Sequence, residues 1–167
     1  YRASGIIQTQ EEADEYNSKY NLSYLSGTAW TPGDVKYIDL NNDGKIDRGD
    51  NNLNNMGDMT IIGNTTPRYQ YTINGSISWK DLSLSVMFQG VGKRDWDPGT
   101  APYFWGSGAY AQVTVFNEHM DYWREDNKDA YYPKPYIHSA GGVGPFRNKI
   151  MQTSDRYLQS GAYCRLK

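Results

Sequence analysis

An acidic loop at residues 39–50 is the part of the sequence whose residue types and spacing best suit a chemical role. It runs D-L-N-N-D-G-K-I-D-R-G-D, the spacing D-x-[DN]-x-[DN]-G with an acidic residue at the twelfth position. Oxygens at the first, third and fifth positions of such a loop converge on one ion, and the glycine at the sixth allows a sharp turn. The pattern predicts a structural Ca²⁺ site with these ligands: Asp39, Asn41, Asp43, the Lys45 carbonyl, Asp47 and Asp50.

The surroundings of this loop differ from those of a helix–loop–helix calcium motif. A strand-like stretch, residues 35–38, precedes it and an Asn-rich stretch, 51–55, follows, so we expect an EF-hand-like loop without flanking helices. Asp50 is one methylene shorter than the Glu that usually binds the ion through both oxygens, which predicts weak affinity. Three interpretations stay open: calcium that stiffens the loop, a polar turn without an ion, and a calcium-triggered switch.

Aromatic side chains form the second candidate site. Flat aromatic faces pack against pyranose rings, so such a group could bind a sugar substrate, and packing of the rings on one another is the alternative. The residues concerned are Trp96, Tyr103, Phe104 and Trp105.

Catalytic chemistry has little support in the sequence. His119 and His138 have no Ser or Asp neighbours that suggest a catalytic triad. Acidic residues gather at 118–126, but an acidic helix face is far commoner than a pair of glycosidase carboxylates. We therefore predict that the chain is not an enzyme.

Composition excludes several further classes. The 167 residues carry a net charge of −2, so no basic excess is present to attract nucleic acid. No apolar run approaches the ~20 residues of a membrane-spanning helix. The single Cys164 excludes an internal disulfide and a zinc site built on Cys pairs. The first residue is Tyr1 and no closing turn follows the last, so we expect a piece of a longer chain.

Residues 68–90 carry the clearest structural signal, a strict alternation of apolar and polar side chains in two runs. Residues 69–79 alternate aromatic or aliphatic with Gln, Thr, Asn and Ser, and 82–89 do the same after Lys80-Asp81, with Met87 as the one exception. A period of two over two runs joined by two residues predicts an antiparallel β-hairpin.

The polar face of this hairpin is almost uncharged, which bears on its surroundings. A sheet that faces water usually carries Lys and Glu on its outer side, whereas Ser, Thr, Asn and Gln suit the wet interior of a barrel and an apolar face suits lipid. The runs also match the ~9–11 residues with which a tilted strand crosses a bilayer. The alternation by itself leaves a membrane barrel and a soluble sandwich or barrel nearly balanced.

Shorter elements are expected on either side of the hairpin. Thr9 and Glu12 have the spacing of a capping box ahead of a helix at 10–19, and Val35–Ile38 predicts a short strand in an otherwise turn-rich stretch. Apolar residues at helical spacing predict a second helix at 114–124.

Several ordered blocks of the sequence resemble one known family. They are GIIQTQEE (5–12), PGDVKYIDLNNDGKID (32–47), IGNTTPRY (62–69), FQGVGKRD (88–95), YWREDN (122–127), AYYP (130–133) and DRYLQSGAYCRLK (155–167). In content and order they resemble the late barrel region of SusC/RagA-type TonB-dependent transporters of the bacterial outer membrane. The resemblance covers nearly the whole chain and implies a fragment from the carboxy-terminal part of such a barrel.

The resemblance implies an all-β fold, in which antiparallel strands of a transmembrane β-barrel carry long extracellular loops with short helices. Residues 1–67 would be an extracellular loop with a short helix and the EF-hand-like loop, and 68–90 a transmembrane hairpin whose short Lys80-Asp81 turn is periplasmic. Residues 91–156 would be a second extracellular loop with a short helix, and 157–167 the start of the next barrel strand.

Two functions of different classes are compatible with these features. The family implies part of an importer of oligosaccharides, or of peptides in some relatives, that acts with a SusD-like surface lipoprotein and the TonB energy-coupling system. The alternative is a secreted, calcium-stabilised glycan-binding β-domain without a transport role. Solubility separates them, because only the second predicts a soluble, cooperatively folding monomer.

Overall fold

The computed structural model describes residues 1–106, 114–136 and 149–167. They divide into two compact units. The first, which we call the loop unit, comprises Tyr1–Ile62 and the described residues of Pro98–Arg156; the second, the strand unit, comprises Gly63–Asp97 and Tyr157–Lys167. Segments distant in the sequence thus meet within each unit.

The loop unit begins with a short antiparallel ribbon and one regular helix. Strand β1 (Ala3–Ile6) pairs with β2 (Val35–Tyr37), and helix α1 (Gln10–Lys19) lies between them in the sequence. The helix begins as predicted, because the Thr9 side chain accepts a hydrogen bond from the Glu12 N–H at 3.2 Å. Strand β1 was not predicted, since its four residues show no alternation.

Two further regular elements of the loop unit are single turns. They are α2 (Pro102–Trp105) and the 3₁₀ helix η2 (Asn117–Met120); a further turn, η3 (Asp155–Tyr157), follows at the boundary of the units. The prediction of a helix over 114–124 is therefore wrong outside η2, the single turn within that stretch. The Trp123 N–H binds the Tyr132 carbonyl at 2.9 Å instead of a carbonyl one turn earlier, so a long-range contact replaces helical bonding. No helix in the described part of the chain is long and apolar enough to cross a membrane.

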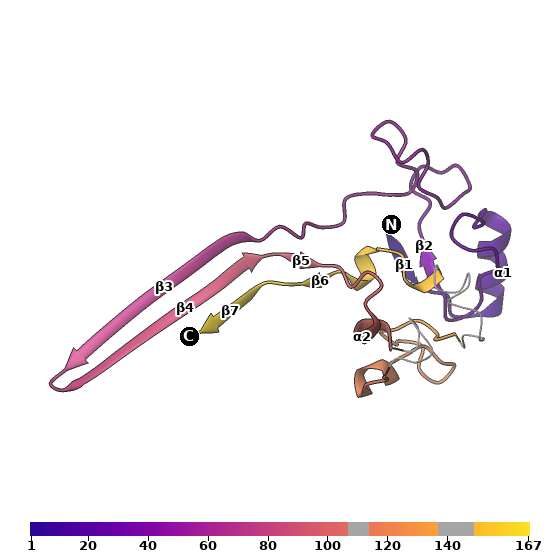
Figure 1. The fold of residues 1–167 in the computed structure, drawn as a ribbon. Helices are drawn as coiled ribbons and strands as arrows, with labels where there is room; N and C mark the ends of the chain where they lie inside the picture. The colour runs from indigo at the N-terminus through magenta and orange to yellow at the C-terminus, as the bar shows by residue number, and fades with distance from the viewer. Residues whose placement is uncertain (107–113, 137–148) are drawn as a thin grey trace. The chain divides into compact units, whose positions relative to one another are not determined.

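The strand unit contains the predicted hairpin. Strand β3 (Arg68–Trp79) and strand β4 (Leu82–Lys93) are antiparallel, and β7 (Tyr163–Leu166) pairs with the other edge of β4. Figure 1 shows β3 and β4 as a long ribbon joined by a tight turn. Two short strands, β5 (Asp95–Trp96) and β6 (Gln159–Ser160), form a separate antiparallel pair. The strands of the described residues are therefore antiparallel, as predicted for an all-β chain, and no closed barrel is present.

The pairing register puts the apolar residues of both strands on one face. Ile73 lies opposite Phe88, and Ile77 lies opposite Leu84. Directly opposed residues in an antiparallel pair share a face, so the two alternating patterns combine into one apolar surface. The other face pairs Ser76 with Ser85 and continues the polar pattern.

Gly90 is required where the three strands meet. A Cβ atom at this position would lie 2.4 Å from Cζ and the hydroxyl oxygen of Tyr71 and 2.5 Å from the Tyr163 carbonyl oxygen, so the end of the Tyr71 side chain occupies the space beside the glycine. We expect Gly90→Ala to reduce stability by about 1–3 kcal/mol, because a backbone atom as well as the ring must shift. Equilibrium unfolding of the variant checks this value. Gly75→Ala is the matched control, since its Cβ would meet nothing closer than 3.7 Å.

Candidate functional site

The acidic loop has the backbone shape that its sequence predicts. Gly44, at the sixth position, has a φ of +78°, in the left-handed region that glycine adopts without strain. The Asp39 carboxylate accepts the N–H groups of Asn42 at 2.6 Å and Gly44 at 3.0 Å, which closes the turn. Ile46 is fully buried and its N–H binds the Asn21 carbonyl at 3.1 Å, so the loop is anchored to the segment after α1.

The other predicted ligands mostly bind the loop's own polar groups. Asn41 and Asp43 each accept the N–H two residues ahead, at 3.1 and 2.9 Å. Asp47 accepts the Gly49 N–H at 2.6 Å, and Asp50 accepts the Asn55 amide at 3.0 Å. Among the described residues, no group of three or more His, Cys, Asp or Glu is gathered as a metal site. The loop has the turn and the oxygen donors that calcium prefers, but its carboxylates are spread out, so the calcium site stays a prediction.

Asp58 closes this loop and was missed in the sequence, because it lies beyond the calcium-type spacing. Its carboxylate accepts the Leu40 N–H at 2.7 Å and the Asp47 N–H at 2.9 Å, which lie near opposite ends of the loop. Asp58 is buried, and burial raises the pKa of its carboxyl although both N–H donors oppose that rise. The loop is therefore cross-linked by an acidic side chain from outside the motif.

The four aromatic candidates have different surroundings. Phe104 and Trp105 are buried, whereas Tyr103 in the same helix turn is 62% exposed. Trp96 is half-buried in β5 and belongs to the strand unit, whereas the other three belong to the loop unit. Phe104 packs edge-on against Trp105 and Tyr132, with ring centroids 4.9 and 5.5 Å apart. The packing of rings on one another thus accounts for part of this group, and its role in binding substrate stays a prediction.

Trp105 also lines a mostly apolar cavity of about 230 Å³, together with His119 and Tyr132. Nδ1 of His119 accepts the Phe116 N–H at 3.1 Å, so Nε2 carries the proton and donates to the Tyr103 carbonyl at 3.0 Å. Both nitrogens of His119 are therefore engaged in holding the backbone, which agrees with its non-catalytic interpretation. His138 lies outside the described residues.

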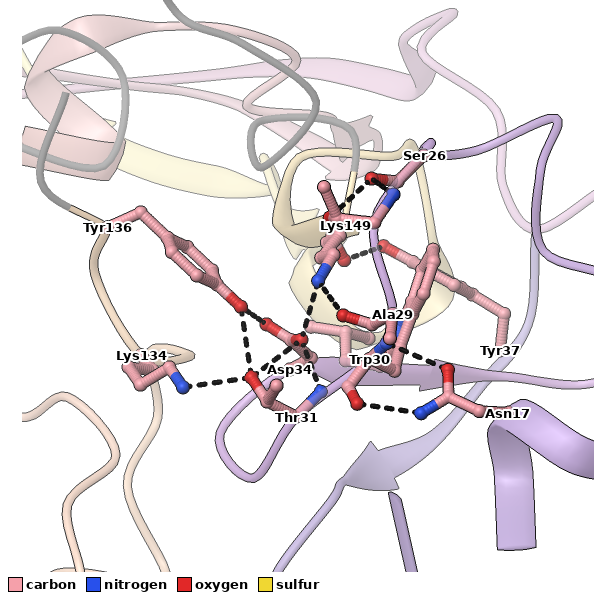
Figure 2. Close-up of polar contacts among 12 residues, drawn as sticks. Asn17, Ser26, Ala29, Trp30, Thr31, Asp34, Tyr37, Lys134, Tyr136 and Lys149 are labelled. Atoms are coloured by element: carbon pink, nitrogen blue, oxygen red, sulfur yellow. Dashed lines mark hydrogen bonds and ion pairs between the residues drawn. The ribbon is translucent and has the colours of Figure 1, made fainter. Parts of the chain in front are cut away.

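Asp34 is a buried polar group of the loop unit with several partners, and the sequence did not single it out. It ends a turn in which its N–H binds the Thr31 carbonyl at 3.1 Å, with Gly33 at a φ of +95°. Its fully buried carboxylate accepts the Thr31 N–H at 2.8 Å, the Tyr136 hydroxyl, and the Lys149 ammonium at 3.3 Å. Figure 2 shows Tyr136 and Lys149 reaching Asp34 from two other segments of the chain, beside Thr31 of its own turn.

Asp34 and Lys149 form a buried ion pair between residues 115 positions apart. The Lys149 ammonium also donates to the Ala29 carbonyl and lies 5.1 Å from the centre of the Trp30 ring. Burial lowers the pKa of Lys149, and the nearby Asp34 carboxylate opposes this shift. Burial, with the Asp34 charge beside it, raises the pKa of Tyr136, so its hydroxyl stays a proton donor. The described charged groups of this cluster bind one another and nearby backbone, as in a structural cross-link.

Comparison with known proteins connects the chain to one class. It is 26% identical over 136 residues to the TonB-dependent receptor P26 of Formosa agariphila, an alignment that covers 81% of this chain and 12% of that receptor. The chain therefore spans only a small part of the relative's length. No model of a known protein family matches it. Over this stretch the chain is similar to a TonB-dependent receptor.

Proposed function

We propose that this chain is part of the barrel of a SusC-type, TonB-dependent importer of oligosaccharides in the outer membrane, which acts with a SusD-like lipoprotein. The observation that carries the proposal is the two-faced hairpin β3–β4, in a chain similar to a TonB-dependent receptor. One face is mostly polar and is uncharged between the Gln70↔Val91 and Ser78↔Ser83 pairs, and the other is apolar.

The apolar face of this hairpin is strongly exposed in the strand unit. Ile73, Ile77 and Leu84 are 61%, 67% and 58% exposed, values far from those of a protein core. A contiguous apolar surface of this kind needs a lipid or protein environment. Each strand has 12 residues, enough to cross the hydrocarbon layer at a tilt. Lipid against the apolar face and a water-filled lumen against the polar face would suit the side chains on each side of the hairpin.

The lengths of the connections give the proposed orientation. Outer-membrane barrels have short periplasmic turns and longer extracellular loops. The two-residue turn Lys80-Asp81 would then be periplasmic, and the loop unit would be extracellular, where the substrate and the SusD-like lipoprotein arrive. The acidic loop and the aromatic residues at 103–105 lie in the loop unit and would face this side.

Cysteine labelling of the complete receptor in intact outer membranes tests the proposal, in a Cys164→Ser background. We expect a water-soluble thiol reagent to label cysteines at the lumen-facing positions Thr72, Asn74, Ser76 and Ser85. Labelling should be at least tenfold slower at the lipid-facing positions, because thiolate forms poorly in hydrocarbon. These are Tyr71, Ile73, Ile77, Leu84, Val86 and Phe88. Equal labelling of the two sets would contradict the membrane assignment and favour the secreted glycan-binding domain.

Calcium at residues 39–50 is part of the same proposal, as a stiffener of an extracellular loop. Four carboxylates in this loop repel one another, so a cation should hold them closer together. We expect dissociation constants of about 10⁻⁴–10⁻³ M, a range filled at extracellular calcium concentrations. Terbium luminescence excited through tyrosine measures binding, and added calcium should displace the terbium and reduce the signal. Asp43→Ala should abolish the signal and Asp14→Asn, outside the loop, should keep it; equal signals would leave the loop a polar turn.

A further inference from the structure

A groove lies between helix α1 and the β1–β2 ribbon and extends to Ile38, the residue before the acidic loop. Its volume is about 260 Å³. One wall is a single face of α1 and the residue after it, and the other is formed by residues of the two strands. The groove is smaller than the ~300–1,000 Å³ of a typical small-molecule site, so it suits one ring-sized unit of a longer ligand.

The floor of the groove is rigid and its hydrogen bonds are internal. The buried Tyr16 hydroxyl donates to the Tyr37 carbonyl at 2.8 Å and accepts the Tyr37 N–H at 3.0 Å, which fixes the helix to β2. Tyr20 packs edge-on against Tyr16, with ring centroids 5.1 Å apart. Tyr20 is only half-buried and lines the groove, so it presents an aromatic surface above a fixed base.

The rim of the groove carries balanced charges. Glu12 and Lys36 neutralise each other as an ion pair across the groove. Glu15 and Lys19 are exposed one helical turn apart, and the Lys19 ammonium lies 5.1 Å from the centre of the Tyr20 ring. A hydrogen bond with Tyr20 raises the pKa of Lys19, so this amine stays charged. The groove lining therefore offers carboxylate acceptors and ammonium donors beside the Tyr20 ring, and Asp39 lies close enough to act on Lys19.

We infer that this groove binds one neutral sugar unit of the imported oligosaccharide. A ligand of either net charge meets a like charge on the rim, whereas hydroxyl groups can donate to Glu15 and accept from Lys19 at the same time. The Tyr20 ring supplies an apolar surface for the C–H face of a pyranose. The inference rests on the proposed import function and adds the place where the substrate is held.

The test uses the complete receptor, purified in detergent, with a panel of neutral gluco-, xylo- and manno-oligosaccharides. Calorimetry identifies the tightest-binding oligosaccharide, and that one is titrated into the variants. We expect Glu15→Gln and Tyr20→Ala each to weaken binding by about tenfold or more, since each removes a charged hydrogen bond or a ring contact. Asp14→Asn and Tyr24→Ala are matched controls outside the groove lining and should bind like wild type.

Hydroxyl-radical footprinting locates the ligand independently of affinity. The bound oligosaccharide should protect Tyr20 from oxidation at least twofold and leave Tyr24 unprotected. If the sugar binds, neither variant weakens its binding and Tyr20 is not protected, then the groove is excluded as the sugar site and the proposed import function is unaffected. If no oligosaccharide binds and a zwitterionic dipeptide protects Tyr20 instead, the sugar assignment is overturned together with the oligosaccharide substrate of the proposed function.

Discussion

Replacing Asp34 by alanine is expected to destabilise the loop unit by about 3–5 kcal/mol, because the substitution leaves Lys149 buried without its counter-ion. The side chains of Asp34 and Lys149 are 0% and 1% exposed, so water cannot replace the lost carboxylate beside the ammonium. The Thr31 N–H and the Tyr136 hydroxyl lose their acceptor in the same variant. Hydrogen exchange measured by mass spectrometry on the complete protein should show this loss as faster exchange at Trp30, Val35 and Tyr37.

A double variant separates the charge effect from a general loss of packing. Asp34→Leu with Lys149→Met removes both charges and keeps apolar volume, so it should restore much of the protection that Asp34→Ala loses. Ser18→Ala, at an exposed helix position, serves as the control for the exchange measurement. If the free energy of local opening in Asp34→Ala stays within about 1 kcal/mol of the wild-type value, the ion pair does not hold the unit together.

Ile73→Lys is expected to destabilise the barrel by about 2–4 kcal/mol, because it places a charge on the lipid face near the middle of β3. Ile73 lies opposite Phe88 on the apolar face, seven positions before Lys80 of the turn, which puts it deep in the proposed membrane-spanning length. Reversible unfolding of the complete barrel in lipid vesicles with urea or guanidinium measures the change in free energy.

The neighbouring residue supplies the control. Asn74 lies opposite Met87 on the polar face, so Asn74→Lys adds the same charge toward the proposed lumen and should cost less than about 1 kcal/mol. Equal costs for the two lysines would mean that the faces do not differ in environment. A larger cost for Asn74→Lys would invert the assignment of lipid and lumen.

Local elements were predictable where the signal lies within a short stretch. The hairpin follows from alternation over two runs, and the observed pairing extends from Trp79↔Leu82 to Arg68↔Lys93. Helix α1 follows from the Thr9 cap, whose hydrogen bond to Glu12 is present. The turn at Gly44 follows from the loop motif and has the expected positive φ. Each of these depends on neighbours within a few residues.

Elements that depend on distant partners were not predictable in the same way. The apolar spacing at 114–124 suggested a helix, but Trp123 instead packs against Gly33 and donates its indole N–H to Gln8 at 2.9 Å. Strand β1 has little signal of its own and is defined by its pairing with β2. Asp58 closes the acidic loop from outside the motif. Tertiary contacts outweighed local preference at each of these positions.

The sequence alone determined the hairpin, its two faces and the composition of the acidic loop. Each of these depends on residue types at fixed spacing within one short stretch of the chain. Only the tertiary structure decided that residues 1–62 and the described part of 98–156 form one unit. Two contacts that join them are the hydrogen bond from the Lys134 N–H to the Gly33 carbonyl, at 2.9 Å, and the ion pair between Asp34 and Lys149. The tertiary structure also decided that Asp34 is a buried cross-link, and that α1 and β2 enclose a groove. The reason is physical: a buried charge is stable only beside its partner, and the partner's position in the sequence is fixed by the fold and not by any local pattern.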